Sequence, residues 1–170
     1  MVTLDAATSP SATAPEFVAA VGPLFENAPG FLYRLAAARP FDSTERLFER
    51  ARALAHDMPE PLQVELIDAH PRLGAAPAAM SPMSRREQAA GGAGANAEPE
   101  DARLARQLDD LNRSYEGRFG FRYCVWVAGR SRAALIPEMA AALEGAREAE
   151  LDRAIDAVID IAADRLRRAA

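Results

Sequence analysis

Residues 148–168 read EAELDRAIDAVIDIAADRLRR, and this stretch decides the fold class. Its apolar residues recur every three or four positions, namely Leu151, Ile155, Val158 and Ala162. Residues at these spacings lie on one face of an α-helix, and the charged residues between them fall on the opposite face. The stretch therefore predicts a long amphipathic helix that buries one side.

Helical signals continue through the rest of the chain. Thr13 with Glu16 is a capping-box pattern, and Asp42 with Glu45 predicts another helix start. Helices are predicted to begin near residues 13, 29, 42, 61, 84, 98, 131 and 148. Only FRYCVWV at 121–127 looks extended, and it is too short and solitary to build a sheet. We therefore predict an all-α, single-domain helical bundle of about seven or eight helices with one short extended segment.

Proline and glycine predict where these helices end. Gly22-Pro23 and Pro40 stop the first two, and Pro71 requires the fourth to end at His70. Gly117 and Gly120 are predicted to close the helix that starts near residue 98. Two other features are expected to disturb helices, namely Gly91-Gly92-Ala93-Gly94 and Pro137, which should kink its helix unless it lies in the first turns.

Composition narrows the class of protein. The 170 residues suit one domain, with residues 1–12 predicted as a disordered lead-in and 13–170 as the folded part. The net charge of −5 argues against a nucleic-acid partner. The single cysteine, Cys124, predicts a reducing compartment. Because we see neither a signal peptide nor an apolar run long enough to span a membrane, we expect no membrane association and a cytoplasmic location.

The histidines are the first candidates for chemistry. The sequence has two of them and no zinc-binding motif, so we predict no metal. His56 lies near a helix end, where a solvated cation is the simpler interpretation. His70 is the last residue before Pro71, where an apolar helix gives way to a loop. This position can direct an imidazole into a cleft, although many histidines at helix ends have no catalytic role.

Four further residues can be interpreted either structurally or functionally. Ser84 and Glu87 fit a capping box, yet a helix N-terminus also suits a substrate carboxylate. Arg165 ends the apolar stripe of the last helix, where it either reaches water, pairs with a carboxylate or grips a substrate oxygen. Cys124 has no histidine near it in sequence, and we interpret it as a small buried side chain rather than a nucleophile.

Five motifs occur in an order that resembles one known family. They are FENAPGFL with RPF, then IDAHPRLG, SRREQ, LNRSYEGRFGFRY and GRSR. Across about residues 16–168 the chain resembles the decarboxylases of 2-oxo-4-hydroxy-4-carboxy-5-ureidoimidazoline (OHCU), which act in urate degradation. The resemblance implies an all-α fold, a homodimer, and a lyase that needs no cofactor and converts OHCU to (S)-allantoin.

The same resemblance implies roles for individual residues. His70 matches the catalytic histidine. The matching substrate-binding positions are Pro71, Ser84, Glu87, Gln88, Phe121, Arg122, Tyr123, Cys124, Val125 and Arg165. The chain departs from the family at Arg72, where an acidic residue is usual, and at Arg122, where FGFPF becomes FGFRY.

The implied chemistry suits these residue types. The leaving carboxylate is attached to a carbon beside a ring C=N–C=O system, which can hold the electrons without a cofactor. Our hypothesis is that His70 contacts the hydroxyl–carboxyl carbon and protonates it after carbon dioxide leaves. Glu87 would accept hydrogen bonds from ring or ureido N–H groups, and Gln88 would hydrogen-bond the ureido amide. Arg165 would stabilise the negative charge that develops. The alternatives are a lyase acting on a related heterocyclic acid and a catalytically inactive binding protein of the same fold.

Overall fold

The long amphipathic stretch forms the last and longest helix of the computed structural model, α9 (Arg147–Ala169). The structure describes residues 12–89 and 99–169. Within these ranges the other α-helices are α2 (Ala14–Val21), α3 (Pro29–Ala37), α4 (Thr44–Asp57), α5 (Glu60–Asp68), α6 (Pro82–Ala89), α7 (Pro99–Phe119) and α8 (Arg132–Ala142). Two 3-10 helices, η1 (Gly22–Phe25) and η2 (Pro77–Ala79), complete the elements. The prediction of an all-α fold is confirmed.

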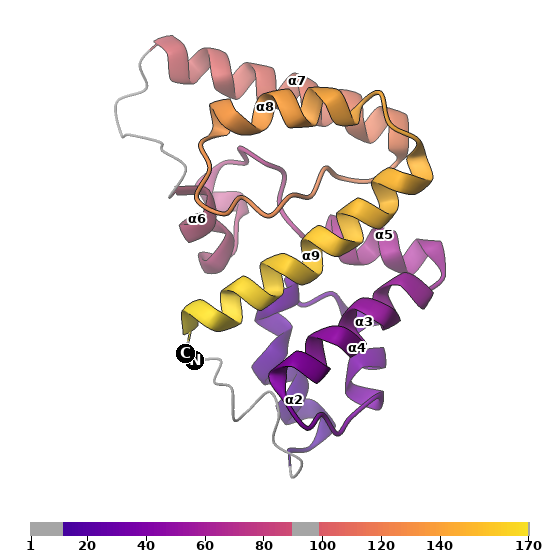
Figure 1. Ribbon diagram of the computed structural model, residues 1–170. Coiled ribbons are helices and arrows are strands. Elements are labelled where there is room, and N and C mark those ends of the chain that lie inside the picture. The colour runs from indigo at the N-terminus through magenta and orange to yellow at the C-terminus, as the bar shows by residue number, and fades with distance from the viewer. Residues whose placement is uncertain (1–11, 90–98, 170) are drawn as a thin grey trace.

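Helix α9 runs diagonally through the molecule and organises the core (Figure 1). It contacts α4, α5 and η1, while α7 and α8 lie side by side beyond its N-terminal half. The predicted stripe is buried, and Ile155, Val158 and Ala162 have no exposed surface. Burial of each large aliphatic side chain contributes roughly 1.5–3 kcal/mol. The apolar spacing of one helix therefore fixes the side on which the others pack.

Several helix ends differ from the prediction by a few residues. The N-cap of α4 is Ser43 rather than Asp42, because the Ser43 hydroxyl accepts the Arg46 N–H. Helix α7 continues through Gly117 to Phe119. It stops at Gly120, which has a φ of +80°, a left-handed conformation that glycine adopts without strain. Helix α8 starts after the predicted cap Ser131 and includes Pro137 in its interior.

The start of α6 differs in a way that matters for the site. The helix begins at Pro82, and the Ser81 hydroxyl accepts the Ser84 N–H at 3.1 Å. The predicted capping box of Ser84 and Glu87 is therefore wrong. Proline suits a first helical position because the N–H it lacks would be unpaired there anyway. This earlier start leaves the Ser84 side chain free to face the interior, where only 2% of the residue is exposed.

The segment at 121–127 is extended and joins no strand in the described ranges, as predicted. It connects α7 to α8, and in the view of Figure 1 it runs between α8 and α9 toward α6. No helix in those ranges is both long and apolar enough to cross a bilayer. Of the lead-in predicted at 1–12, residues 1–11 lie outside the described residues, as does the glycine run at 91–94.

Candidate functional site

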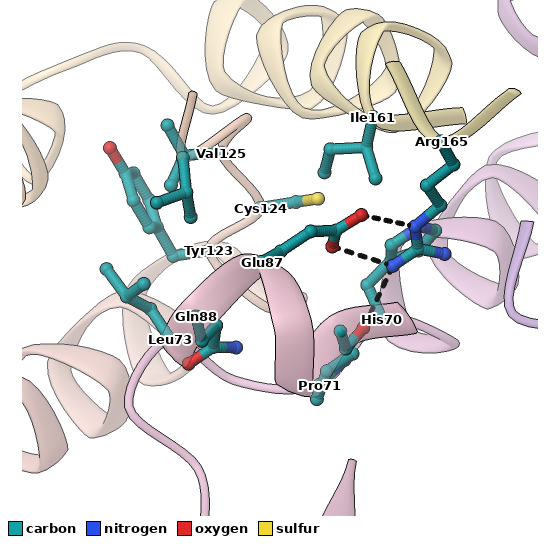
Figure 2. A pocket seen from close by; sticks show the side chains of 12 residues that line it. His70, Pro71, Leu73, Glu87, Gln88, Tyr123, Cys124, Val125, Ile161 and Arg165 are labelled. Carbon is teal, nitrogen blue, oxygen red and sulfur yellow. Dashed lines mark hydrogen bonds and ion pairs between the residues drawn. The ribbon is translucent and has the colours of Figure 1, made fainter. Parts of the chain in front are cut away.

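A pocket lies where the end of α5, helix α6, the extended segment and α9 meet (Figure 2). Its cavity volume is about 30 Å³, below the roughly 300–1,000 Å³ of typical small-molecule sites, so the lining side chains must move before a ligand of that size can enter. The lining residues are His70, Pro71, Leu73, Ser84, Glu87, Gln88, Tyr123, Cys124, Val125, Val127, Ile161 and Arg165. Four segments far apart in sequence thus bring most of the predicted site residues together.

The imidazole of His70 is buried and neutral. The residue is 4% exposed, and its Nδ1 lies 3.2 Å from the Leu66 carbonyl oxygen. A carbonyl oxygen only accepts hydrogen bonds, so Nδ1 carries the proton and Nε2 presents a lone pair. Nε2 is buried and has no hydrogen-bond partner among the residues that the structure describes. Burial and the positive charge of Arg165 lower the pKa of His70 to about 4, although Glu26 opposes this shift.

Arg165 faces Glu87 across the pocket (Figure 2). Its Nε and Nη2 donate to the two carboxylate oxygens of Glu87 at 2.7 and 3.0 Å. Nη2 also donates to the Ser84 hydroxyl at 2.9 Å, and Nη1 donates to the Leu24 carbonyl at 3.0 Å. With 2% of its side chain exposed, Arg165 is held as a fixed cation paired with carboxylates, one of the alternatives that the sequence allowed.

Glu26 is a second partner of Arg165, and the residue-by-residue analysis of the sequence did not single it out. Its carboxylate accepts hydrogen bonds from Arg165 at 2.8 Å, from Ser84 at 2.5 Å and from Ser81 at 2.9 Å. Desolvation raises the pKa of this carboxyl, but the Ser84 hydrogen bond and the charge of Arg165 outweigh it, so the net pKa is lowered. Glu26 therefore stays ionised beneath the pocket.

Gln88 lines the pocket but uses its amide within the protein. Its side-chain oxygen accepts the Gly74 N–H at 2.8 Å, and its nitrogen donates to the Arg72 carbonyl at 3.2 Å. These bonds fix the loop that follows His70 and Pro71. Gly74 has a φ of +81°, which glycine adopts without strain.

The extended segment divides into residues inside and outside the pocket. Tyr123, Cys124 and Val125 line it, together with Val127, which was not predicted. Phe121 is buried in the core against Tyr115, and Arg122 turns toward the end of α5, so neither lines the pocket. Burial raises the pKa of the Cys124 thiol to about 12, so the thiol stays protonated and the residue behaves as a small buried side chain.

Three pocket residues were missed by the sequence analysis, namely Leu73, Val127 and Ile161. They are apolar, so only their place in the fold distinguishes them from core residues. His56 lies outside the pocket, 3.0 Å from Asp156 and 3.4 Å from Asp152 on α9. Among the residues described, no group of three or more histidine, cysteine or acidic side chains could hold a metal ion.

This arrangement suits proton transfer to a small polar molecule. A neutral imidazole with a free lone pair can accept a proton and return it, and a buried guanidinium can stabilise negative charge that forms beside it. Fold and site together define the class as an all-α protein with a pocket for acid–base chemistry.

The chain belongs to the OHCU decarboxylase family, because the family model described as OHCU decarboxylase matches residues 10–167. It is 31% identical over 150 residues to a 2-oxo-4-hydroxy-4-carboxy-5-ureidoimidazoline decarboxylase of Halalkalicoccus jeotgali, covering 88% of this chain and 82% of that protein. The enzyme of the same name from Haloferax volcanii is 29% identical, with 88% and 86% covered.

Other relatives are longer than this chain. It is 33% identical over 146 residues to the uric acid degradation bifunctional protein PucL of Bacillus subtilis, of which it spans only 28% while 86% of this chain is covered. A crystal structure of OHCU decarboxylase determined in the presence of (S)-allantoin superimposes with a TM-score of 0.69 at 19% identity, covering 87% of this chain and 94% of that one. This similarity confirms the fold.

Proposed function

We propose that this protein decarboxylates OHCU to (S)-allantoin in urate degradation, as an enzyme without a cofactor. One observation carries the proposal, namely that the free Nε2 of His70 belongs to the same pocket as the ion pair of Arg165 and Glu87. The family to which the chain belongs supplies the substrate.

The reaction needs electrons and protons to move in a defined order. Loss of carbon dioxide leaves the bonding electron pair on the ring, where the C=N bond takes it up and its nitrogen binds a proton from water. The remaining enol gives its hydroxyl proton to Nε2 of His70. His70 then returns this proton to the neighbouring ring carbon, which carries the ureido group, while the oxygen becomes a carbonyl.

His70 thus acts as proton donor only after it has accepted a proton. A pKa of about 4 means that the free protein holds the ring neutral near neutral pH. The receiving carbon differs from our hypothesis from the sequence, which named the hydroxyl–carboxyl carbon. That carbon becomes the carbonyl of allantoin and carries no hydrogen, so the proton must reach its neighbour. Because His70 delivers the proton to one face of this ring carbon, the product is a single enantiomer.

Arg165 and Glu87 have complementary parts in this scheme. All three guanidinium nitrogens of Arg165 already have partners, and Glu87 is the carboxylate partner that lines the pocket. A substrate oxygen can reach the guanidinium when Glu87 turns toward the ring or ureido N–H groups. As charge moves onto the ring, Arg165 stabilises it. Glu26 remains below and keeps Arg165 in place.

The departures from the family do not favour another substrate. The guanidinium of Arg72 donates to Glu116 at 2.7 and 2.5 Å, and neither Arg72 nor Arg122 lines the pocket. No observation on these residues supports a different heterocycle, so OHCU remains the proposed substrate. The homodimer and the cytoplasmic location stay predictions, to be tested by light scattering and by cell fractionation.

The experiment follows OHCU generated in solution by enzymatic oxidation of urate. Without catalysis OHCU decays slowly to racemic allantoin. We expect the protein to accelerate the decay and to produce the circular dichroism signal of (S)-allantoin alone. A protein that leaves both the rate and the racemic product unchanged would support the inactive binding protein instead. Faster turnover of a ring analogue than of OHCU would support the lyase with a different substrate.

A further inference from the structure

Helix α5 ends at Asp68, two residues before His70, and leaves backbone carbonyl groups without helical partners. The last turn of any α-helix has such groups, and Pro71 has no N–H to offer them. The Nδ1–H of the His70 ring donates to one of them, the Leu66 carbonyl oxygen. The carbonyl oxygens of Asp68 and His70 both accept from Nη1 of Arg122, at 2.7 and 2.9 Å.

Arg122 is attached to this helix end by its backbone as well. Its N–H donates to Oδ1 of Asp68 at 2.8 Å. The main chain and the side chain of one residue thus make two hydrogen bonds to Asp68, the last residue of α5, and one to His70 just beyond it. Bonds from a charged donor are stronger than neutral ones, and a cation is favoured at a helix C-terminus. The extended segment, which pairs with no strand in residues 12–89 or 99–169, is attached to the end of α5 at this point.

We propose that Arg122 is a positioning residue for His70, which fixes the backbone from which the imidazole projects into the pocket. Arg122 lies behind the pocket and does not line it, so it acts through His70 rather than on the substrate. The ring itself is oriented by the Leu66 carbonyl, and Arg122 holds the carbonyl on the other side of the same residue. This role rests on the proposed decarboxylation.

The role also explains a departure from the family sequence. Where FGFPF is usual, FGFRY places an arginine, and a proline there could supply neither the N–H nor the guanidinium. In this chain the extended segment is therefore attached to Asp68 and His70 by hydrogen bonds from Arg122.

The test is a double-mutant cycle between Arg122→Met and His70→Ala. Misplacing a catalytic group by about 1 Å can cost up to about 10²-fold in rate, so we expect Arg122→Met to lower kcat by roughly tenfold or more. KM should change by less than about threefold, because no substrate contact is lost. In the His70→Ala background the same change should alter the residual rate by less than about twofold, since the group it positions is gone.

Two further variants separate positioning from stability. Arg122→Lys, which can still donate to both carbonyls, should recover part of kcat. Arg147→Met is the control, because Arg147 likewise joins this region to α5, through the Phe119 carbonyl at 2.9 Å and Glu60 at 2.7 Å, but at the start of α5 and not beside His70. It should lower the urea midpoint and leave kcat unchanged. Equal rate losses in both His70 backgrounds, or a change in KM alone, would overturn the assignment.

A readout without substrate distinguishes this proposal from the proposed function. Only two histidines are present, so NMR can follow the His70 ring directly. In Arg122→Met the pKa of His70 should move up from about 4 toward its ordinary value of 6.5 as the ring loosens toward solvent, and in Arg147→Met it should not. If wild type fails to act on OHCU but the ring responds in this way, only the proposed function is wrong. An unchanged His70 signal in Arg122→Met refutes the positioning role.

Discussion

Lowering the pH should destabilise the protein through His70, and a His70→Asn variant should lack this component. The imidazole is 4% exposed, and its pKa is about 4 in the folded protein against 6.5 as its ordinary value. As the pH falls below 6.5, the His70 imidazole therefore becomes protonated in the unfolded chain while it stays neutral in the folded protein. The free energy of unfolding decreases through this window and levels off below the folded pKa.

The size of the effect follows from the two pKa values. Between about pH 7 and about pH 4.5 the linkage amounts to about 2 kcal/mol, since each pKa unit corresponds to about 1.4 kcal/mol. Carboxylates such as Glu26 also lose stabilisation as the pH falls. The part of this loss that does not depend on His70 is the same in wild type and in His70→Asn, and it cancels in the difference between them.

The assay is urea unfolding followed by circular dichroism at several pH values. Asparagine can still donate to the Leu66 carbonyl, so the variant keeps the local hydrogen bond while losing the titrating group. We expect the difference in unfolding free energy to shift by about 2 kcal/mol in favour of the variant as the pH falls. If the difference in unfolding free energy does not change with pH, the pKa of His70 is the same in the folded and unfolded states. The claim that its imidazole is buried and neutral would then be wrong.

Three other outcomes follow from single contacts. Ser43→Ala should cost about 1 kcal/mol in urea unfolding because it removes the α4 cap, whereas Asp42→Ala, at an exposed position, should cost almost nothing. Glu87→Gln should lower kcat/KM for OHCU by about 10²-fold, with folding kept because Arg165 retains Glu26; unchanged kinetics would exclude Glu87 from the reaction. Tyr115→Phe, which leaves the buried Glu150 short of one donor, should cost about 1–3 kcal/mol in unfolding without changing kcat.

The sequence was most informative where the signal is local. The apolar spacing in residues 148–168 predicts α9 and its buried face, because the period of a helix is a property of the backbone. The capping pattern of Thr13 and Glu16 is confirmed for the same reason. The pairing of His70 with Pro71 likewise marks a helix end, but α5 ends two residues earlier than predicted, at Asp68, and His70 follows it at the pocket.

The parts that escaped prediction depend on residues that are distant in sequence. Glu26 meets Ser84 across 58 positions and Arg165 across 139, and no local pattern encodes such contacts. Glu26 also has a φ of 50°, because it caps the C-terminus of η1 in the left-handed conformation. The start of α6 was misplaced because Ser81 and Ser84 are both good caps, and Pro82 favours the earlier one.

The central claim is that His70 moves the proton that makes allantoin, and one comparison tests it most directly. OHCU is generated in solution, and the circular dichroism of the product is followed with wild type and with purified, folded His70→Ala. The account predicts rapid formation of (S)-allantoin with wild type, and with the variant a slow decay that yields mostly racemic product. Turnover by the variant at the wild-type rate and with the same handedness would contradict it.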